Sequence, residues 1–600
     1  MTTKKLKFST AFIFALMFCV FEFNGIAFAW NKFYVKKGGN DSNDGLTWNT
    51  AFATITKAVN SAGRNDDIRV AAGTYAENIK LDKVLFIYGS YPADGGDVKD
   101  YEKNITTIDG QGKDRVIYSS AGQIVIDGFT ITNGKTYADG GGICYNYAAD
   151  ISNCNFVKNS AQNGGGLACE NTSAGNIKNC TFTKNSATEQ GGGIYNVENI
   201  KNCSFIENSA GNDGGGVYEA VSDMTDCSFI KNTAANHGGG AYDVNYVTDC
   251  SFIENSAGSD GGGIYNALGD ITNCTFIKNT AANYGGGVYY IISLRNCVFN
   301  ENKAANGGGV YKPSRGYNAV TTIYGCTFDG NEATADGGGI QVIGANSEKI
   351  EILNSTFTVN YAKRGGAVFL EGNGDLRGNG WKRIKHCTFV DNISDSGTEL
   401  YTASTTVDDV INCIIWNADG DCIANKNKAL LTFTSCAMDE DECVGENLDD
   451  DDIYDSMITV DLHPIFITDF TPSHSPETAS FNGVEHTIFR LEESDTDLIH
   501  KGIALTFNKY QLETEFHDDQ LGVSRNIEQP TVGAVDYQDS SSNEDYGGGN
   551  DEANSQELQK PQEPQDNVNY NSVNRKSSSG CNSGILIYGL VLVAGLSMKK

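Results

Sequence analysis

Positive charge and proline are both scarce in this 600-residue chain. Lys and Arg number 44 against 76 Asp and Glu, so the formal net charge is −32, and proline occurs only 8 times. Such acidity argues against nucleic acid as a partner, because phosphates are repelled. The 69 glycines lack a period of three, which excludes collagen. There is also no nucleotide-binding loop, no HExxH and no nucleophile constellation, so the sequence assigns no catalytic residue.

The first residues have the features of an export signal. Lys4, Lys5 and Lys7 precede an apolar run from Ala11 to Val20. The small-x-small triplet that ends at Ala29 then predicts cleavage after residues 1–29. An exported protein with 17 cysteines would ordinarily be expected to form disulfides. The spacing of the cysteines favours another role.

One motif, exemplified by GGGIYNVENIKNCSFIENSA at 191–210, recurs through the middle of the chain with steps of 23 or 24 residues. Its cysteine column comprises Cys154, Cys180, Cys203, Cys227, Cys250, Cys274, Cys297, Cys326, Cys387 and Cys413, with Ser355 in place of one cysteine. Its phenylalanine column comprises Phe156, Phe182, Phe205, Phe229, Phe252, Phe276, Phe299, Phe328, Phe357 and Phe389. Its asparagine column comprises Asn159, Asn185, Asn208, Asn232, Asn255, Asn279, Asn302, Asn331, Asn360 and Asn392.

This motif predicts an all-β solenoid. Cys-x-Phe places both side chains on one face of a strand. The residue before each cysteine is Asn, Asp, Gly or His, types that tolerate left-handed backbone, so a bend is expected there. Triple glycines disfavour helix. We therefore predict a right-handed, single-stranded parallel β-helix over 64–415, with three short strands per coil and stacked Cys, Phe and Asn.

Two interior columns of this solenoid have specific expected roles. Stacked, inward-pointing cysteines are expected to stay free thiols that fill space in the core. A line of single cysteines also lacks the convergent ligands of a metal site. The asparagines are expected to bond to backbone amides at a turn and to the asparagines above and below.

The alternation of FxxN with GGG(I/V) resembles the polymorphic outer membrane protein repeat, over roughly residues 135–395. That resemblance implies a β-helix displayed at a cell surface, often adhesive. It places the protein at the cell surface, at the outer membrane or outside the cell.

Both ends of the array are expected to be covered. Phe52, Ile55, Val59 and Ala62 have helical spacing. The segment around them resembles the N-terminal cap of secreted β-helix proteins, including some polysaccharide lyases, and we assign the cap to 30–63. Within it lies the one candidate metal site, where oxygen ligands could hold calcium, although an ordinary turn explains the same residues: Asp41, Asn43 and Asp44. No other cofactor is expected.

Beyond Cys413 the period decays, and 416–540 are assigned to C-terminal coils and a cap. HPIFITDF (463–470), FRLEESDTDLIHKG (489–502) and TVGAVDY (531–537) resemble the C-terminal part of the choice-of-anchor Q family, with IHKG where that family has IDAG. Residues 541–579 have the composition of a disordered linker. Residues 580–600 resemble a Synergist-type C-terminal sorting signal, which implies a transient membrane hold and cleavage near Gly580 and Cys581. A permanent membrane anchor is the alternative.

The tyrosine after each triple-glycine strand is the preferred ligand-binding position. If the preceding aliphatic residue points inward, these tyrosines form an outward column that could bind a glycan, or simply a self-stacking ladder that stiffens the sheet: Tyr195, Tyr218, Tyr242, Tyr265, Tyr289 and Tyr311. A basic cluster, Arg377, Lys382, Arg383 and Lys385, is the only candidate for lyase chemistry on the stem, with solubilising charge as the simpler explanation.

Three functions therefore stay open. The sequence favours a non-enzymatic, surface-anchored adhesin or glycan-binding stalk with a monomeric stem, whose partner is a polysaccharide or a host or neighbouring cell surface. The second is a polysaccharide lyase or glycoside hydrolase on the same fold. The third is a purely structural surface-coat protein.

Overall fold

The computed structural model describes residues 30–403 except 172–174, 315–319, 346–348 and 374–380. Beyond residue 403 it describes only short segments, mostly strands, between 408 and 488. The predicted signal peptide, the linker and the sorting segment lie outside these residues. The description below concerns the described residues alone.

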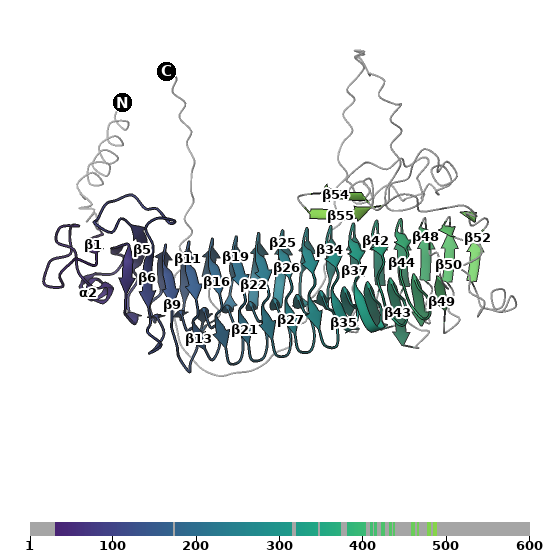
Figure 1. Cartoon of the computed structure of the whole chain (residues 1–600), viewed down its shortest axis with the longest axis horizontal. Coiled ribbons are helices and arrows are strands. Elements are labelled where there is room, and N and C mark those ends of the chain that lie inside the picture. The colour runs from purple at the N-terminus through teal and green to yellow at the C-terminus, as the bar shows by residue number, and fades with distance from the viewer. Residues whose placement is uncertain are drawn as a thin grey trace, which may run out of the picture. The chain divides into compact units, whose positions relative to one another are not determined.

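The chain winds into a right-handed parallel β-helix (Figure 1). One coil runs through β18 (Ile194–Val197), β19 (Asn199–Lys201), β20 (Ser204–Ile206) and β21 (Ser209–Ala210) before β22 (Val217–Thr225) begins the next. Residues one coil apart pair in parallel, as Ile194 does with Val217 and Phe205 with Phe229. Sheets of 29, 16 and 8 strands result, one for each side of the coil.

The strand arrangement differs from the expectation in one respect. The glycine strand and the strand that leads to the cysteine, such as β18 and β19, belong to the same 29-stranded sheet. The third side is built from Ser-Ala or Thr-Ala pairs that follow the asparagine, as in β21, β24 (Thr233–Ala234) and β27 (Ser256–Ala257). Two-residue strands carry too little alternation for a sequence pattern to predict.

The bend before each cysteine is confirmed. All the described residues at this position have φ between 48 and 63°. Asn412, the last of the expected positions, lies outside the described residues. The triple glycine forms another corner: Gly191 has φ +66°, and a Cβ on Gly192 would stand 2.3 Å from the carbonyl oxygen of Gly215 on the next coil. Glycine recurs because the backbones approach so closely there.

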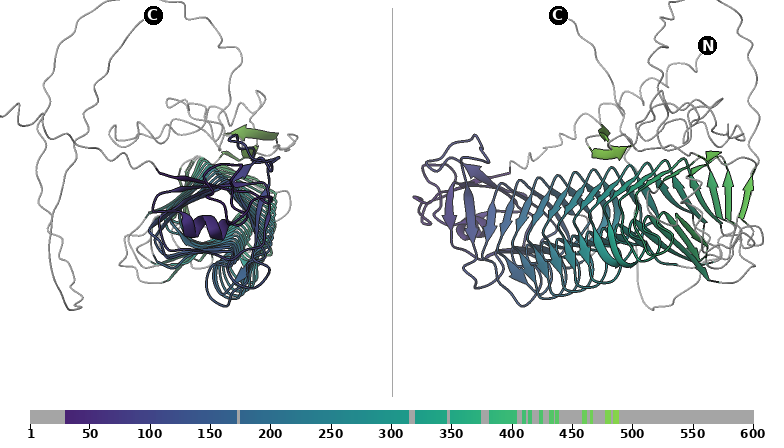
Figure 2. Two further views of the ribbon diagram at one scale, coloured as in Figure 1. Left: turned by 90° about the vertical axis from the view of Figure 1, so that its left-hand side faces the viewer. Right: turned by 45° about the vertical axis from the view of Figure 1, so that its right-hand side comes forward.

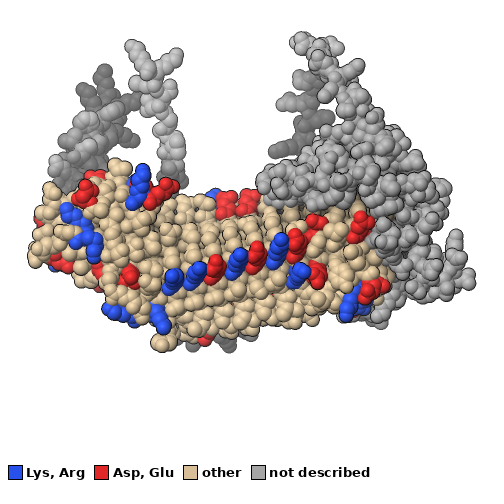
Figure 3. Space-filling model, in the orientation of Figure 1, with Lys and Arg blue, Asp and Glu red and all other residues tan. Residues whose placement is uncertain are grey.

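A further left-handed bend, two residues after each phenylalanine, is occupied mainly by Lys and Glu. Seven of these residues have φ between 51 and 55°: Lys158, Lys184, Glu207, Lys231, Glu254, Lys278 and Glu301. From Lys184 onward the charges alternate, and Lys184–Glu207, Lys231–Glu254 and Lys278–Glu301 are ion pairs of 3.3–3.4 Å. Figure 3 shows this alternating row along the stem. Alternation avoids stacking like charges on adjacent strands.

The interior confirms the predicted columns. The ten phenylalanine rings stack at 4.5–5.0 Å between centroids with interplanar angles of 3–8°. The ten cysteines of the motif are buried free thiols. Each sulfhydryl packs as a small apolar group and donates locally, as Cys203 does to the carbonyl of Lys201 at 3.2 Å.

The asparagine column is a continuous hydrogen-bond ladder, as predicted. Asn208 donates its side-chain amide to the carbonyl of Phe182 at 2.9 Å and to Oδ1 of Asn232 at 3.0 Å. Its own Oδ1 accepts from both the backbone and the side-chain nitrogen of Asn185, each at 3.0 Å. Asn392 instead donates to the buried carboxylate of Glu399, which occupies the third-glycine position of its coil.

The predicted N-terminal cap is also present. Helix α2 (Ile55–Ser61) begins after Thr54, whose hydroxyl accepts from the Lys57 amide. Its buried face, which includes Ile55 and Val59, contacts β1 (Lys32–Val35), β2 (Asp67–Ala71) and β4 (Ile79–Leu81). The view along the stem in Figure 2 shows this helix across the open end of the first coils. Covering this end protects unpaired strand edges.

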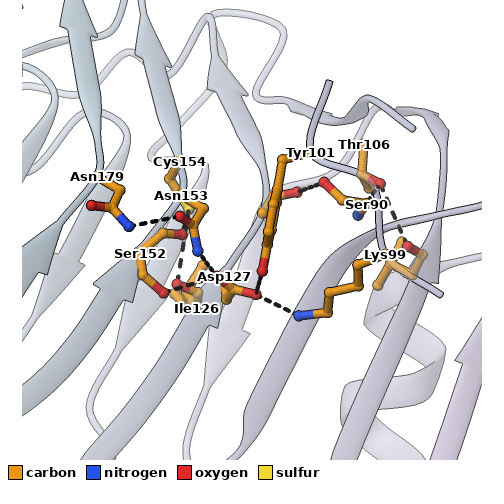
Figure 4. A network of polar contacts seen from close by, with 12 residues as sticks. Ser90, Lys99, Tyr101, Thr106, Ile126, Asp127, Ser152, Asn153, Cys154 and Asn179 are labelled. Carbon is orange, nitrogen blue, oxygen red and sulfur yellow. Dashed lines mark hydrogen bonds and ion pairs between the residues drawn. The ribbon is translucent and has the colours of Figure 1, made fainter. Parts of the chain in front are cut away.

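A polar network fastens the first coils together. Asp127, the last residue of β8 (Gln123–Asp127), is 6% exposed. Its carboxylate pairs with the Lys99 ammonium and accepts hydrogen bonds from the hydroxyls of Tyr101 and Ser152, at 3.1 and 2.8 Å, and from the Asn153 amide at 2.6 Å (Figure 4). Lys99 and Tyr101 come from the loop after β5 (Phe86–Tyr91), so one carboxylate joins that loop to the coil of Ser152.

No helix among the described residues has both the length and the apolar character needed to cross a membrane.

Candidate functional site

The tyrosines named from the sequence lie together on one face of the stem, here called the tyrosine face. They come from β18, β22, β25 (Ala241–Thr248), β28 (Ile264–Ala267), β32 (Val288–Tyr289) and β36 (Val310–Lys312). The aliphatic residue before each tyrosine is buried, whereas the tyrosine is half-buried, so the rings point outward. Neighbouring tyrosines pair in register from coil to coil.

The six tyrosine rings stack on one another. Successive centroids lie 5.4, 4.8, 4.9, 4.6 and 5.4 Å apart, with interplanar angles of 2–18°. Such close stacking covers the ring faces with neighbouring rings and leaves ring edges and hydroxyls for a ligand. This favours hydrogen bonding to a ligand over stacking of sugar rings on aromatic faces.

An Asp–His–Asp row borders this face at the positions just before the triple glycine. Nδ1 of His237 lies 2.8 Å from Oδ1 of Asp213, and its Nε2 lies 3.4 Å from Oδ2 of Asp260. The imidazole also packs against Tyr265, with 4.7 Å between ring centroids. Burial raises the pKa of the Asp260 carboxyl above its ordinary value, against the lowering effect of His237.

Carboxylates also border the face at the positions just after the tyrosine. Glu219 and Asp243 lie on adjacent coils, and Asn266 on the following coil donates its amide to Asp243. Burial, reinforced by the negative charge of Asp243, raises the pKa of the Glu219 carboxyl. Burial and then the Glu219 charge raise the pKa of Tyr218 to about 12. The Tyr218 hydroxyl therefore stays protonated at neutral pH and can donate a hydrogen bond.

The side chains of the three residues proposed for calcium all form hydrogen bonds within the cap segment. Asp41 accepts from the amides of Ala53 and Thr54 at 2.8 and 3.0 Å, and Asp44 accepts from the amide of Leu46 at 3.0 Å. Asn43 donates to the carbonyl of Ala51 at 3.2 Å. Within the described ranges, no group of three His, Cys, Asp or Glu side chains is arranged to hold a metal ion. Calcium binding here stays an untested prediction.

The basic cluster has carboxylate partners that spacing did not reveal. Arg383, on β44 (Trp381–Lys385), lies 3.2 Å from Asp409 and 3.9 Å from Glu351. Lys385 lies 3.8 Å from the same Glu351, and burial lowers its pKa. Lys382 is buried on the opposite side of the strand. Arg377 lies outside the described residues, as do the predicted processing residues Ala29, Gly580 and Cys581.

Sequence reasoning identified the tyrosine column but not its borders. The Asp213, His237 and Asp260 positions differ in residue type from coil to coil, so no repeated letter marks them. Register across coils brings them together. The sequence signal that could have located these three positions is that each residue immediately precedes a triple glycine.

The fold and its repeated faces define the chain as a parallel β-helix repeat protein. Residues 37–281 match the family described as a protein of unknown function, DUF1565. Residues 273–290 and 325–342 match the Chlamydia polymorphic membrane protein repeat, which confirms the repeat resemblance for this part of the chain.

The similarity of the chain to individual proteins is low. No curated protein matches the chain. Among solved structures, a rhamnogalacturonan lyase is similar at 12% identity and a TM-score of 0.20, covering 61% of this chain and 83% of its own. Pectate lyase Pel9A is similar at 12% identity and a TM-score of 0.21, covering 84% of this chain and 96% of its own.

Proposed function

We propose that the protein is a surface-displayed β-helix stalk whose tyrosine face binds glycans. The observation that carries the proposal is the column of six stacked, half-buried tyrosines, repeated once per coil. A regular column offers the same contact many times along one line. Weak contacts to a repeating polymer then add up through effective concentration.

The chemistry of the face favours uncharged sugars. Tyrosine hydroxyls donate and accept hydrogen bonds, and the bordering carboxylates of Glu219 and Asp243 can accept from sugar hydroxyls. The carboxylates Asp213, Asp260, Glu219 and Asp243 would repel uronic acids. We therefore expect neutral polysaccharide, on a host or neighbouring cell, as the ligand of this face.

Surface display is supported by the repeat match and by the export and sorting sequences. The polymorphic membrane protein repeat is found, by its description, in a membrane protein family. The predicted signal peptide and the tail at 580–600 would bring the stem to the same location.

The test is binding of the purified full-length protein to a glycan array, compared with the variant Tyr218→Ala/Tyr242→Ala/Tyr265→Ala. Binding of neutral glycans should fall at least about tenfold in the variant, since three adjacent contacts of a multivalent set are removed. Tyr246→Ala is the matched control, because Tyr246 is 54% exposed on the same strand as Tyr242 but lies outside the stack. Equal binding by all three proteins would rule out the tyrosine face.

An enzyme is the second candidate, and the Asp213–His237 pair favours it. A histidine held by a carboxylate at 2.8 Å, beside the Asp260 carboxyl whose pKa is raised, can exchange protons. The full-length protein and His237→Ala should be incubated with acidic and neutral polysaccharides. Unsaturated-product absorbance or new reducing ends, lost in the variant, would establish a lyase or a hydrolase and overturn the purely adhesive role.

A structural coat protein is the third possibility. It predicts neither turnover nor glycan retention by the native protein. The two experiments above therefore distinguish all three functions.

A further inference from the structure

The alternating charge row breaks at its N-terminal end. Lys158 and Lys184 follow each other on adjacent coils, whereas every later residue through Glu301 has a neighbour of opposite charge. Lys184 pairs with Glu207 at 3.3 Å. Lys158 has no carboxylate partner in the part of the chain that the structure describes. Its ammonium group is therefore available to bind an anion, although the protein as a whole has a net charge of −32.

A groove lies at this point of the row. Its volume is about 490 Å³, and its lining comes from three consecutive coils: Asp109, Gln111, Gly112, Asn133, Gly134, Lys135, Lys158 and Ser160. Gln111, Asn133 and Lys158 sit on left-handed bends with φ of 55–57°. The groove therefore follows the same corner of the solenoid as the charge row.

Two lysines dominate the electrostatics of the groove. Lys135 and Lys158 are both exposed, and neither forms an ion pair with a described residue. The single carboxylate of the lining, Asp109, forms no ion pair with either lysine and accepts hydrogen bonds from neutral donors. Its Oδ1 accepts from the Gln111 amide at 2.8 Å and from the Asn133 side chain at 3.1 Å. The groove thus offers two free cations to a ligand, together with the polar side chains of Asn133 and Ser160.

We infer that this groove binds an acidic polysaccharide through its carboxylate or sulfate groups. Two ammonium groups on neighbouring coils suit anionic groups that repeat along a chain, while amide and hydroxyl groups suit sugar hydroxyls. The groove is open enough to admit a polymer from the side, because its lining residues are largely exposed. The inference extends the proposed glycan-binding role to a second ligand class, on a surface separate from the tyrosine face.

The test is titration calorimetry of the full-length protein with a uronic-acid hexasaccharide, a sulfated hexasaccharide and a neutral hexasaccharide. The variant Lys135→Ala/Lys158→Ala should bind the acidic ligands at least about tenfold more weakly, since two charge-assisted contacts are removed. The matched control is Lys231→Ala/Lys278→Ala, which removes the same net charge from two lysines of the row that are paired with glutamates. The control should change acidic-ligand affinity by less than about twofold, because screening weakens interactions beyond a Debye length of about 8 Å.

Three other results would overturn the proposal. Equal weakening in both double variants would show a response to net charge alone and would overturn the groove. Absence of binding to either acidic ligand at millimolar concentration would overturn it as well. Full competition by inorganic phosphate at equal concentration would show a general anion site and contradict the carbohydrate assignment. Acidic-ligand binding should survive in the triple tyrosine variant, so failure of the tyrosine face and failure of the groove are separable.

Discussion

At the scale of single residues, this protein repeats a few side chains until each becomes a column. A column member stacks on the same residue type above and below. The asparagine ladder shows the consequence, because each amide satisfies groups on both neighbouring coils. The loss of unfolding free energy when one ladder residue is replaced therefore depends on how many buried groups on the neighbouring coils lose their hydrogen-bond partner.

Replacing Asn255 by alanine should destabilise the stem strongly. Asn255 is fully buried, accepts from the backbone and side chain of Asn232 at 2.9 Å, and donates to the carbonyl of Phe229 at 2.9 Å. The change leaves these groups buried without partners, so we expect a loss of about 3 kcal/mol or more. Urea denaturation followed by circular dichroism measures it.

The control is Asn236→Ala, at an exposed position on an adjacent turn, which should cost less than about 0.5 kcal/mol. Similar denaturation midpoints for the two variants would contradict an energetic role for the ladder.

At the scale of elements, the first coils depend on a loop held by ion pairs. Lys99 lies over the ring of Tyr88, 4.2 Å from its centroid, and pairs with Asp127. Asp97 of the same loop pairs with Arg69 at 2.8 Å, but its side chain is 68% exposed. The buried pair should therefore hold the loop, since exposed ion pairs contribute little.

Asp127→Asn should destabilise the N-terminal coils by about 2–3 kcal/mol at neutral pH, because the Lys99 ammonium loses its carboxylate partner in a partly buried site. Burial disfavours the charged form of Asp127, yet hydrogen bonds from Lys99 and Asn153 outweigh it and lower the pKa below 3.8. A lowered folded-state pKa means that the stabilisation is present above the ordinary carboxyl pKa. It is lost as the pH falls through the folded-state value.

Thermal unfolding of the wild type and Asp127→Asn between pH 7 and about pH 2 measures this effect. The gap between the two midpoints should be constant above about pH 5 and should narrow below about pH 4. Asp97→Asn, the exposed counterpart, should shift the midpoint far less. A gap independent of pH would show that Asp127 acts through packing alone.

At the scale of the whole molecule, the acidic charge affects which ligands are attracted, and the terminal sequences predict the cellular location. A formal charge of −32 favours solubility and disfavours polyanions in general, so binding of acidic ligands requires a local exception such as the lysine groove. The predicted export and sorting signals lie outside the described residues, in segments whose sequence resembles known signals.

We predict that the mature protein lacks residues 1–29 and the residues after about Gly580. Both segments would be removed during export and transfer to the surface. Mass spectrometry of the protein isolated from its native cells measures the two ends. A peptide that retains the terminal Met598-Lys599-Lys600 would contradict cleavage of the tail and favour a permanent membrane anchor.

Much of the fold follows from the sequence alone. The period of the coil, the inward columns and the bend before each cysteine depend on spacings of a few residues, and these are visible in one chain. The cap helix was predictable for the same reason, because Ile55 and Val59 form a local pattern, whereas Phe52 lies before the N-cap residue Thr54 and forms a β-bridge with Val35. The tyrosine column was predictable as well, since it stands at a fixed distance from the triple glycine.

Only the tertiary structure determined which residues meet across coils. Coil length varies in the first coils, so Asp127 and Lys99 become neighbours through register rather than through a repeated spacing. The bends at Lys and Glu were unpredictable because these residues ordinarily avoid left-handed backbone, and here ladder hydrogen bonds on both sides impose it. The groove lined by Lys135 and Lys158 likewise arises from the juxtaposition of three successive coils, which no local pattern encodes.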